Sequence, residues 1–169
     1  MKKLKFLYVL LLCIVFSASV YAFEIPCKVT RIVDGDTFHC IPISFISQAK
    51  VHKDGTVSVR LRGVDAPEKT QPFGKDAQES LKELIGGETV LLDIKDIDRY
   101  GRVVAYVFVR GVNVNLEQVK RGMAWAYTEY LDRPYASEFY EAEKQARKEK
   151  KGLWKQSNPI PPWEWRKRR

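Results

Sequence analysis

The chain has 169 residues, of which 45% are hydrophobic and 30% are charged. This mixture is typical of a globular protein and excludes a disordered, collagen-like or membrane-embedded chain. Lysine and arginine number 29 against 21 aspartate and glutamate residues, a formal net charge of +8 at pH 7. Such a basic excess favours a polyanionic partner, either nucleic acid or an anionic membrane surface.

The first 22 residues have the three parts of a secretory signal peptide. Three lysines precede an apolar run over residues 6–16, and a small-x-small cleavage signal ends at Ala22. The apolar run is much shorter than the roughly 20 residues that span a bilayer. We therefore expect cleavage after Ala22 and export to a periplasmic or secreted location, with no membrane association afterwards.

The rest of the chain divides into one domain and a tail. Residues 23–157 are long enough for one sizeable core, and residues 158–169 form a basic tail rich in proline and tryptophan. We expect a monomer whose tail lies extended over the domain, because its prolines interrupt a helix and its tryptophans can anchor it. The basic end, residues 166–169, either increases affinity for polyanions or is simply solvated.

A β-hairpin is predicted at the start of the domain. Two β-runs, residues 28–33 and 37–41, flank an Asp-Gly-Asp turn, which is a strong hairpin signal. The hairpin places the strands that hold Cys27 and Cys40 side by side, and an exported chain with two cysteines most often pairs them. We predict a Cys27–Cys40 disulfide that contributes roughly 2 to 3 kcal/mol.

The remaining pattern indicates three more strands and three helices. Residues 57–62 alternate apolar and polar side chains, so one face of that strand enters the core and the other meets charge. The glycine and proline of residues 63–68 favour a loop after it. Further strands are predicted at 89–94 and 103–109, and helices at 75–85, 115–121 and 136–150. These elements fit an α+β, mainly β fold, a small barrel with about three packed helices.

Several kinds of catalytic site are disfavoured by what the chain lacks. The two histidines, His39 and His52, lie on or beside the predicted hairpin with no nucleophile motif near them, which argues against a serine or cysteine triad. The chain has no His-x-x-x-His or Cys-x-x-Cys spacing, so a zinc site is disfavoured.

The candidate chemistry lies in a set of carboxylates and arginines at strand ends. Carboxylates with a backbone carbonyl suit a hard divalent cation such as calcium. Each of these residues alone could be an ordinary turn residue, Asx-turn, helix start or surface ion pair. The prediction of a catalytic site therefore depends on their occurring together. The set comprises Asp34, Asp36, Arg60, Asp65, Glu68 and Arg102.

Three segments, in this order and spacing, resemble the staphylococcal (micrococcal) nuclease family. They are Val-Asp-Gly-Asp-Thr at 33–37, Arg-Leu-Arg-Gly-Val-Asp-Ala-Pro-Glu at 60–68 and Asp-Arg-Tyr-Gly-Arg at 98–102. The resemblance covers roughly residues 27–154. It implies a five-stranded OB-type barrel with calcium held by Asp36, Asp65 and the backbone carbonyl of Ala66. The family often has threonine where this chain has Ala66, a change that a backbone ligand tolerates.

The resemblance also implies the catalytic roles. Glu68 matches the residue that activates or positions the attacking water, and Arg60 and Arg102 match the pair that clamps the scissile phosphate. Tyr100 and Tyr127 fall near positions that contact the nucleotide, although the spacing before Tyr127 differs by one residue. The implied activity is a calcium-dependent endonuclease that cuts DNA and RNA and leaves 3′-phosphates.

Two other functions stay open at this point. A barrel of this kind can bind nucleic acid without cutting it, because fold does not fix function. A metal-free ribonuclease with His39 and His52 as its acid–base pair is the second alternative. Catalysis is favoured over a pure binding module, because all five charged residues that match the family's site are present: Asp36, Arg60, Asp65, Glu68 and Arg102.

Overall fold

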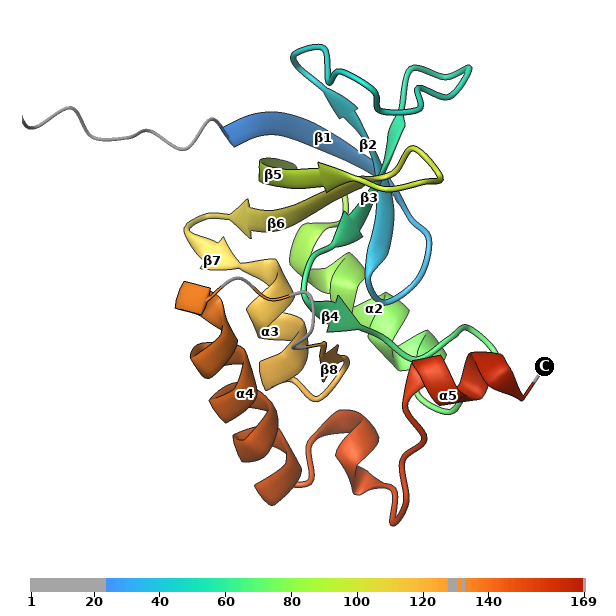
Figure 1. Cartoon of the computed structure of the whole chain (residues 1–169), viewed down its shortest axis with the longest axis vertical. Coiled ribbons are helices and arrows are strands. Elements are labelled where there is room, and N and C mark those ends of the chain that lie inside the picture. The colour runs from blue at the N-terminus through green and yellow to red at the C-terminus, as the bar shows by residue number, and fades with distance from the viewer. Residues whose placement is uncertain (1–23, 128–130, 132, 169) are drawn as a thin grey trace, which may run out of the picture.

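The computed structural model describes residues 24–127, 131 and 133–168, so the predicted signal peptide lies outside the described residues. Five strands form a closed barrel (Figure 1). β1 pairs antiparallel with β2 and β5, β2 pairs with β3, and β5 pairs with β6. A parallel pairing of β3 with β6 closes the ring. The strands are β1 (Glu24–Ile32), β2 (Thr37–Pro42), β3 (Val57–Leu61), β5 (Thr89–Ile97) and β6 (Val103–Val109).

The barrel interior is the main hydrophobic core. In β3 the side chains of Val57, Val59 and Leu61 are buried, whereas Ser58 and Arg60 are half-buried on the outer face, as the alternation predicts. Removing such apolar side chains from water is the main force that stabilises the fold. The fold class predicted from the sequence, a mainly β OB-type barrel, is confirmed.

Three helices pack against the barrel and each other, gathered below it in Figure 1. α2 (Gly74–Ile85) and α3 (Val114–Lys120) begin one residue before their predicted starts, and α4 (Arg133–Lys148) begins three residues early. The side chain of Asn113 accepts a hydrogen bond from the N–H of Leu116 and caps α3. A two-residue strand, β7 (Val112–Asn113), pairs with β6 just before α3.

A short ribbon connects the barrel to the helices. β4 (Val64–Asp65) pairs antiparallel with β8 (Trp125–Ala126). Asp65 was expected on a loop, and this expectation is wrong, because Trp125 pairs with it from a segment 60 residues later in the chain. A local pattern cannot reveal such a partner. The ribbon therefore fixes the backbone of Asp65 more firmly than a loop would.

The C-terminal tail, which was expected to lie extended, contains a short helix. After a 3₁₀ turn, η2 (Gly152–Lys155), the chain bends at residues 156–158 and then forms the helix α5 (Pro162–Lys167). The tail is not extended throughout, because proline fits the first turn of a helix, where its missing N–H costs nothing. The tryptophans do anchor it, since Trp163 packs against a second apolar cluster that includes Trp125 and Trp154.

The predicted disulfide between Cys27 and Cys40 is confirmed. The two residues lie on the paired strands β1 and β2 with their Cα atoms 5.6 Å apart. No helix within the described part of the chain is long and apolar enough to cross a membrane.

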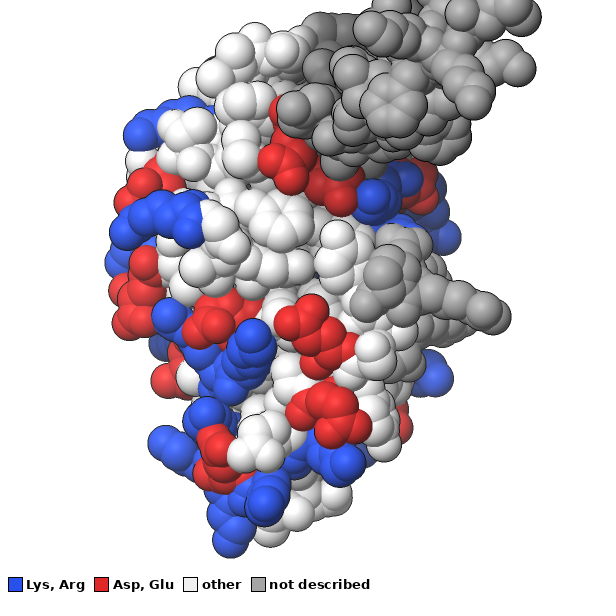
Figure 2. All heavy atoms as spheres, turned by 90° about the vertical axis from the view of Figure 1, so that its left-hand side faces the viewer, with Lys and Arg blue, Asp and Glu red and all other residues white. Residues whose placement is uncertain are grey.

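Charge on one face of the molecule is mixed. Figure 2 shows acidic and basic side chains interspersed there, without one continuous basic patch. On α4, for example, Glu141 pairs with Lys144 and Glu143 pairs with Arg147. The net positive charge therefore does not by itself mark this face as a polyanion-binding surface.

Candidate active site

Asp36 lies in the turn that joins β1 to β2, and the turn is packed tightly against the helices. A Cβ at Gly35 would lie 2.6 Å from the Cβ of Ala77 and 2.7 Å from that of Ala66, which requires glycine there. The amide of Gln118, fully buried in α3, donates to the carbonyls of Gly35 and Ala77 at 2.7 and 3.1 Å. These contacts hold the turn, and with it Asp36, in one position.

The carboxylates of Asp36 and Asp65 are both almost fully buried. Their side chains are 8% and 2% exposed. Asp36 accepts hydrogen bonds from the Thr37 hydroxyl at 3.0 Å and from the N–H of Ala66 at 2.7 Å. The second bond joins the hairpin turn directly to the segment that follows Asp65, so the two aspartates are held together.

Arg60 bridges the two aspartates. Its Nη1 atom lies 2.7 Å from Oδ2 of Asp36, and its Nη2 atom lies 2.9 Å from Oδ1 of Asp65. The register that pairs Arg60 with Thr37 across β2 and β3 brings this side chain to the hairpin turn. A planar guanidinium that contacts two buried carboxylates compensates their charge in a way that water cannot.

Arg102 is held by the turn between β5 and β6. Its Nε atom lies 2.7 Å from Oδ2 of Asp98, while Oδ1 of Asp98 accepts from the N–H groups of Tyr100 and Arg102 at 2.9 and 3.0 Å. The guanidinium lies over the ring of Tyr100, 5.5 Å from its centre. Asp98 thus orients Arg102 through both backbone and side chain.

Glu68 meets a third arginine at the site. Arg166, from α5, places Nη1 2.9 Å from Oε1 of Glu68 and 3.2 Å from Oδ1 of Asp65. Its Nη2 atom lies 2.9 Å from Oδ2 of Asp65. The tail therefore reaches back across the fold to the two acidic residues that the sequence placed in the site.

One hollow of about 360 Å³ brings the predicted site residues together. Tyr127 is the predicted site residue that does not line it, and lies in an adjoining hollow of about 420 Å³ that shares Arg60, Arg102 and Arg166. Tyr127 stacks on Trp163, with ring centres 5.3 Å apart. The first hollow is lined by Asp34, Asp36, Thr37, Arg60, Asp65, Ala66, Pro67, Glu68, Tyr100, Arg102 and Arg166.

Burial and charge perturb two acidic groups in this hollow. Burial, with the neighbouring Asp36 carboxylate, raises the pKa of Asp34 to about 7, although Arg60 opposes the rise. Burial also raises the pKa of Asp65 above its usual value, against the lowering effect of hydrogen bonds from Arg166. The hollow is thus a place where carboxylates are close, desolvated and balanced by arginines, as at many functional sites.

The donor set fits a hard divalent cation. Two buried carboxylates, Asp36 and Asp65, converge on one arginine, and the backbone of Ala66 is bonded to the first of them. Carboxylate and carbonyl oxygens are the ligands that calcium prefers. Within the described residues, no group of three or more His, Cys, Asp and Glu side chains is placed to hold a metal ion, so backbone oxygen and water would complete the shell.

The two histidines lie apart from this hollow. His39 and His52 stack with ring centres 4.8 Å apart, and Nε2 of each contacts the hydroxyl of Ser58, at 3.1 and 3.0 Å. Neither is among the residues that line the site. The two rings share contacts with one hydroxyl, and Arg31 also contacts the His39 ring. This arrangement gives no support to a histidine acid–base pair at the site.

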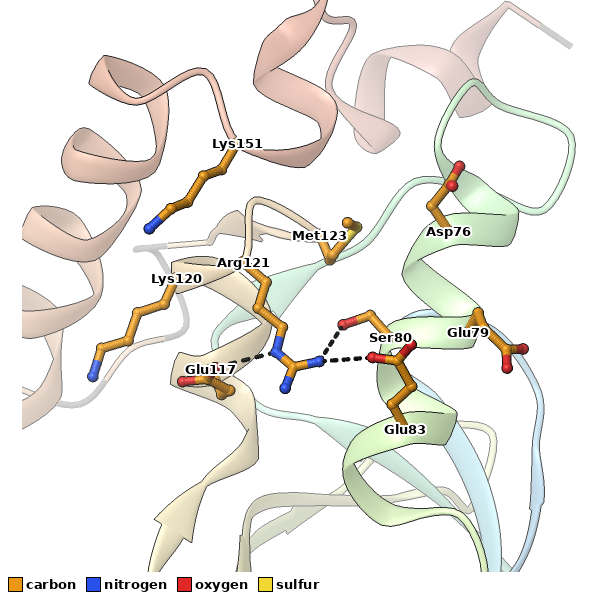
Figure 3. A pocket seen from close by; sticks show the side chains of 9 residues that line it. All are labelled: Asp76, Glu79, Ser80, Glu83, Glu117, Lys120, Arg121, Met123 and Lys151. Carbon is orange, nitrogen blue, oxygen red and sulfur yellow. Dashed lines mark hydrogen bonds and ion pairs between the residues drawn. The ribbon is translucent and has the colours of Figure 1, made fainter.

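A larger hollow of about 640 Å³ lies between α2, α3 and Lys151, away from the carboxylates described above (Figure 3). Arg121 crosses it and pairs with Glu117 and Glu83, both at 3.1 Å, with Ser80 beside it at 3.4 Å. Its charge is therefore compensated by surface carboxylates. We assign the candidate active site to the smaller hollow, where the acidic groups are buried.

The closed OB-type barrel and the hollow lined by carboxylates and arginines are the features of one protein family, and the sequence matches that family. The family described as staphylococcal nuclease homologue matches residues 58–156. The chain therefore belongs to the staphylococcal nuclease family. The matched range contains Arg60, Asp65, Glu68 and Arg102, whereas Asp36 lies before it.

Similar proteins cover nearly the whole chain. One from Escherichia coli, named as an uncharacterized endonuclease, is 36% identical over 163 residues, which are 96% of this chain and 98% of the relative. A protein from Shigella flexneri, named micrococcal nuclease, is 37% identical over 149 residues, 83% of this chain and 79% of its own length. A third, from Haemophilus influenzae and also named as an uncharacterized endonuclease, is 40% identical over 141 residues, 83% of this chain and 72% of its own.

Three residues that contribute to the site were not assigned a role from the sequence. Asp98 orients Arg102, Gln118 holds the turn of Asp36, and Arg166 contacts Asp65 and Glu68. The spacing of Asp98 and Arg102, four residues apart across a turn, is a local signal that could have revealed the first. Gln118 and Arg166 act over separations of 83 and 101 residues, which local sequence does not encode.

Proposed function

We propose that the protein is a calcium-dependent endonuclease that hydrolyses phosphodiester bonds of DNA and RNA and leaves 3′-phosphate ends. Membership of the staphylococcal nuclease family and the endonuclease names of its relatives support nuclease activity. The observation that carries the proposal is the convergence of buried carboxylates and arginines from separate segments in one hollow of about 360 Å³.

Arginines supply the charge that the reaction needs. A phosphodiester is anionic, and attack at phosphorus increases the negative charge on its equatorial oxygens, so fixed cations stabilise the transition state. Arg60 and Arg102 are the proposed phosphate ligands, with side chains 18% and 34% exposed at the hollow. Arginine suits this role because its planar fork bonds two oxygens and stays protonated.

Glu68 is the proposed group that accepts or orients the proton of the attacking water. Its side chain is 33% exposed, so water can reach the carboxylate. Its backbone N–H donates to the side chain of Gln71 at 3.1 Å, and this bond helps to hold the backbone of Glu68 in place. Water then attacks phosphorus and the 5′-oxygen leaves, which yields the proposed 3′-phosphate end.

Asp36, Asp65 and the carbonyl of Ala66 are the proposed calcium ligands. When bound, calcium would add positive charge beside the scissile phosphate and so stabilise the charge that develops there. The two carboxylates are held by the β1–β2 turn and the β4–β8 ribbon, so the site is largely preorganised.

We also propose that the protein works outside the cytoplasm, as a monomer. The Cys27–Cys40 disulfide supports this location, because disulfides persist in oxidising compartments. DNA and RNA are the proposed substrates, with no membrane association after removal of residues 1–22.

One assay tests the proposed function. Purified protein is incubated with DNA and with RNA in calcium, in magnesium or in chelator, and the new ends are identified. We expect cleavage in calcium, none in chelator, and 3′-phosphate products. Full activity in chelator would favour a metal-free ribonuclease, while binding without cleavage in every condition would favour a non-catalytic module.

A further inference from the structure

Arg166 contacts both acidic residues at the edge of the proposed calcium site. Its guanidinium bonds both oxygens of Asp65, at 3.2 and 2.9 Å, and Oε1 of Glu68 at 2.9 Å. This is a bidentate, charge-assisted arrangement, the strongest kind of side-chain hydrogen bonding. Arg166 therefore binds Asp65, a proposed calcium ligand, and Glu68, the proposed proton acceptor for the attacking water.

Three arginine contacts occupy most of the hydrogen-bonding capacity of the Asp65 carboxylate. Oδ1 of Asp65 receives both Nη2 of Arg60, at 2.9 Å, and Nη1 of Arg166, while Oδ2 receives Nη2 of Arg166. A carboxylate oxygen offers two lone-pair sites, so Oδ1 is fully used and the one site left on Oδ2 lies beside Nη2 of Arg166. Because a divalent cation also repels a guanidinium at contact distance, one arginine must withdraw from Asp65 when a cation binds it.

Arg166 is the arginine that can withdraw. Its side chain is 47% exposed, whereas that of Arg60 is 18% exposed and bridges two aspartates. Arg166 also lies one residue before the end of α5, at the C-terminal edge of the fold. Solvation of a released side chain is therefore easier for Arg166 than for Arg60.

The rest of the tail stays in place when this side chain moves. Trp163 stacks on Tyr127 and meets Trp125 edge-on, with ring centres 5.3 and 5.6 Å apart. Gln71 donates to the carbonyl of Ile160 at 2.6 Å. These anchors hold α5 beside the β4–β8 ribbon, so a displaced Arg166 remains next to the site and can return.

We propose that Arg166 is a tethered internal counter-cation that competes with calcium for Asp65 and Glu68. The inference rests on the proposed function, because it takes Asp65 as a metal ligand. The C-terminal helix thereby lowers the calcium affinity of the site and compensates the buried carboxylate when calcium is scarce. Arg166 lies outside the range matched by the family model, which ends at residue 156.

Calcium binding measured by isothermal titration calorimetry tests this proposal without an activity readout. We compare the parent protein with Arg166→Gln, which keeps much of the side-chain length but removes the charge. Lys167→Gln is the matched control, because it removes one positive charge from an exposed neighbour on the same helix. We expect Arg166→Gln to bind calcium about tenfold more tightly, the effect of one charged hydrogen-bonding partner, and the control to stay within about twofold.

Two outcomes would overturn the proposal while the calcium site itself stands. One is equal or weaker calcium binding by Arg166→Gln, and the other is an equal gain in Lys167→Gln, which would indicate a general charge effect. A parent protein and an Arg166→Gln variant that both bind no calcium would instead refute the proposed metal site, and the inference with it.

Discussion

The Nε atom of Arg102 lies 2.7 Å from Oδ2 of Asp98, four residues earlier in the chain. Asp98 is a positioning residue in this account, because it bonds the turn as well as the guanidinium. Burial pushes the pKa of Asp98 upward, but hydrogen bonds from Arg102 and Tyr100 outweigh it and leave the pKa below its usual value. Asp98 is therefore ionised at neutral pH, as its partnership with Arg102 requires.

Asp98→Asn should lower kcat by about tenfold to a hundredfold, since a misplaced phosphate ligand stabilises the transition state less well. Steady-state kinetics on a short DNA checks this. Asp54→Asn is the control and should keep the parent rate, because Asp54 is an exposed aspartate that accepts from the N–H of Thr56 in another turn and lines neither hollow. An Asp98→Asn variant as active as the control would show that Asp98 has no part in orienting Arg102.

Gln118 links the turn of Asp36 to α2 and α3, and its loss should lower the stability of the fold. Gln118→Leu keeps the volume but leaves the carbonyls of Gly35 and Ala77 without this buried donor. We expect the free energy of unfolding to fall by about 2 to 3 kcal/mol in urea titrations. Gln78→Leu, at a half-buried position, should cost about 1 kcal/mol or less. Equal losses in the two variants would contradict the special role of Gln118.

His39 should make stability depend on pH. Burial lowers the pKa of His39 below 6.5, and Arg31 and His52 lower it further, while Asp54 opposes them. In the window just below pH 6.5 the unfolded chain binds the proton and the folded protein does not. Stability therefore rises with pH through that window and decreases on acidification.

The measurement for His39 is the urea midpoint of parent and His39→Gln at pH 7.5 and pH 5.5. Other groups also titrate in this range, so the difference between the two proteins isolates His39. We expect the parent to lose more stability than the variant on acidification. A parent that loses the same amount or less would refute the prediction.

The disulfide should contribute about 3 kcal/mol to the free energy of unfolding, the value expected for a loop closed by residues 13 apart. Urea titration of a Cys27→Ala, Cys40→Ala double variant checks this, and alanine avoids burying a hydroxyl at positions that are fully buried. Thiol titration of the unfolded, unreduced chain from residue 23 onward should find no reactive thiol. Two reactive thiols would contradict the bond.

Much of the barrel could be predicted because its strands are amphipathic and separated by clear turns. The alternation in residues 57–61 identified the buried face, and the Asp-Gly turn identified the hairpin whose strands carry Cys27 and Cys40. The pocket residues followed from three segments with a recognisable spacing, and the structure brings all but Tyr127 into one hollow. Their proposed roles as ligands and catalysts stay predictions.

What could not be predicted depends on contacts between distant segments. Pairing of Asp65 with Trp125 makes a strand where a loop was predicted, and Trp163 packs on Tyr127 from a helix in a segment that was predicted to be extended. The bond from Arg166 to Asp65 spans 101 residues. Nothing in the local composition of a basic tail separates the arginine that returns to the site, Arg166, from an exposed one such as Arg168.

The central claim is that this hollow hydrolyses phosphodiesters, and the turnover of Arg102→Ala on DNA in saturating calcium tests it most directly. Arg102 contacts neither proposed aspartate ligand in the described contacts, so its loss should leave calcium binding and the fold intact. We predict a fall in kcat of roughly a hundredfold or more, because transition-state charge loses a fixed cation. A folded Arg102→Ala protein, verified by circular dichroism, that cuts DNA at the parent rate would contradict the account.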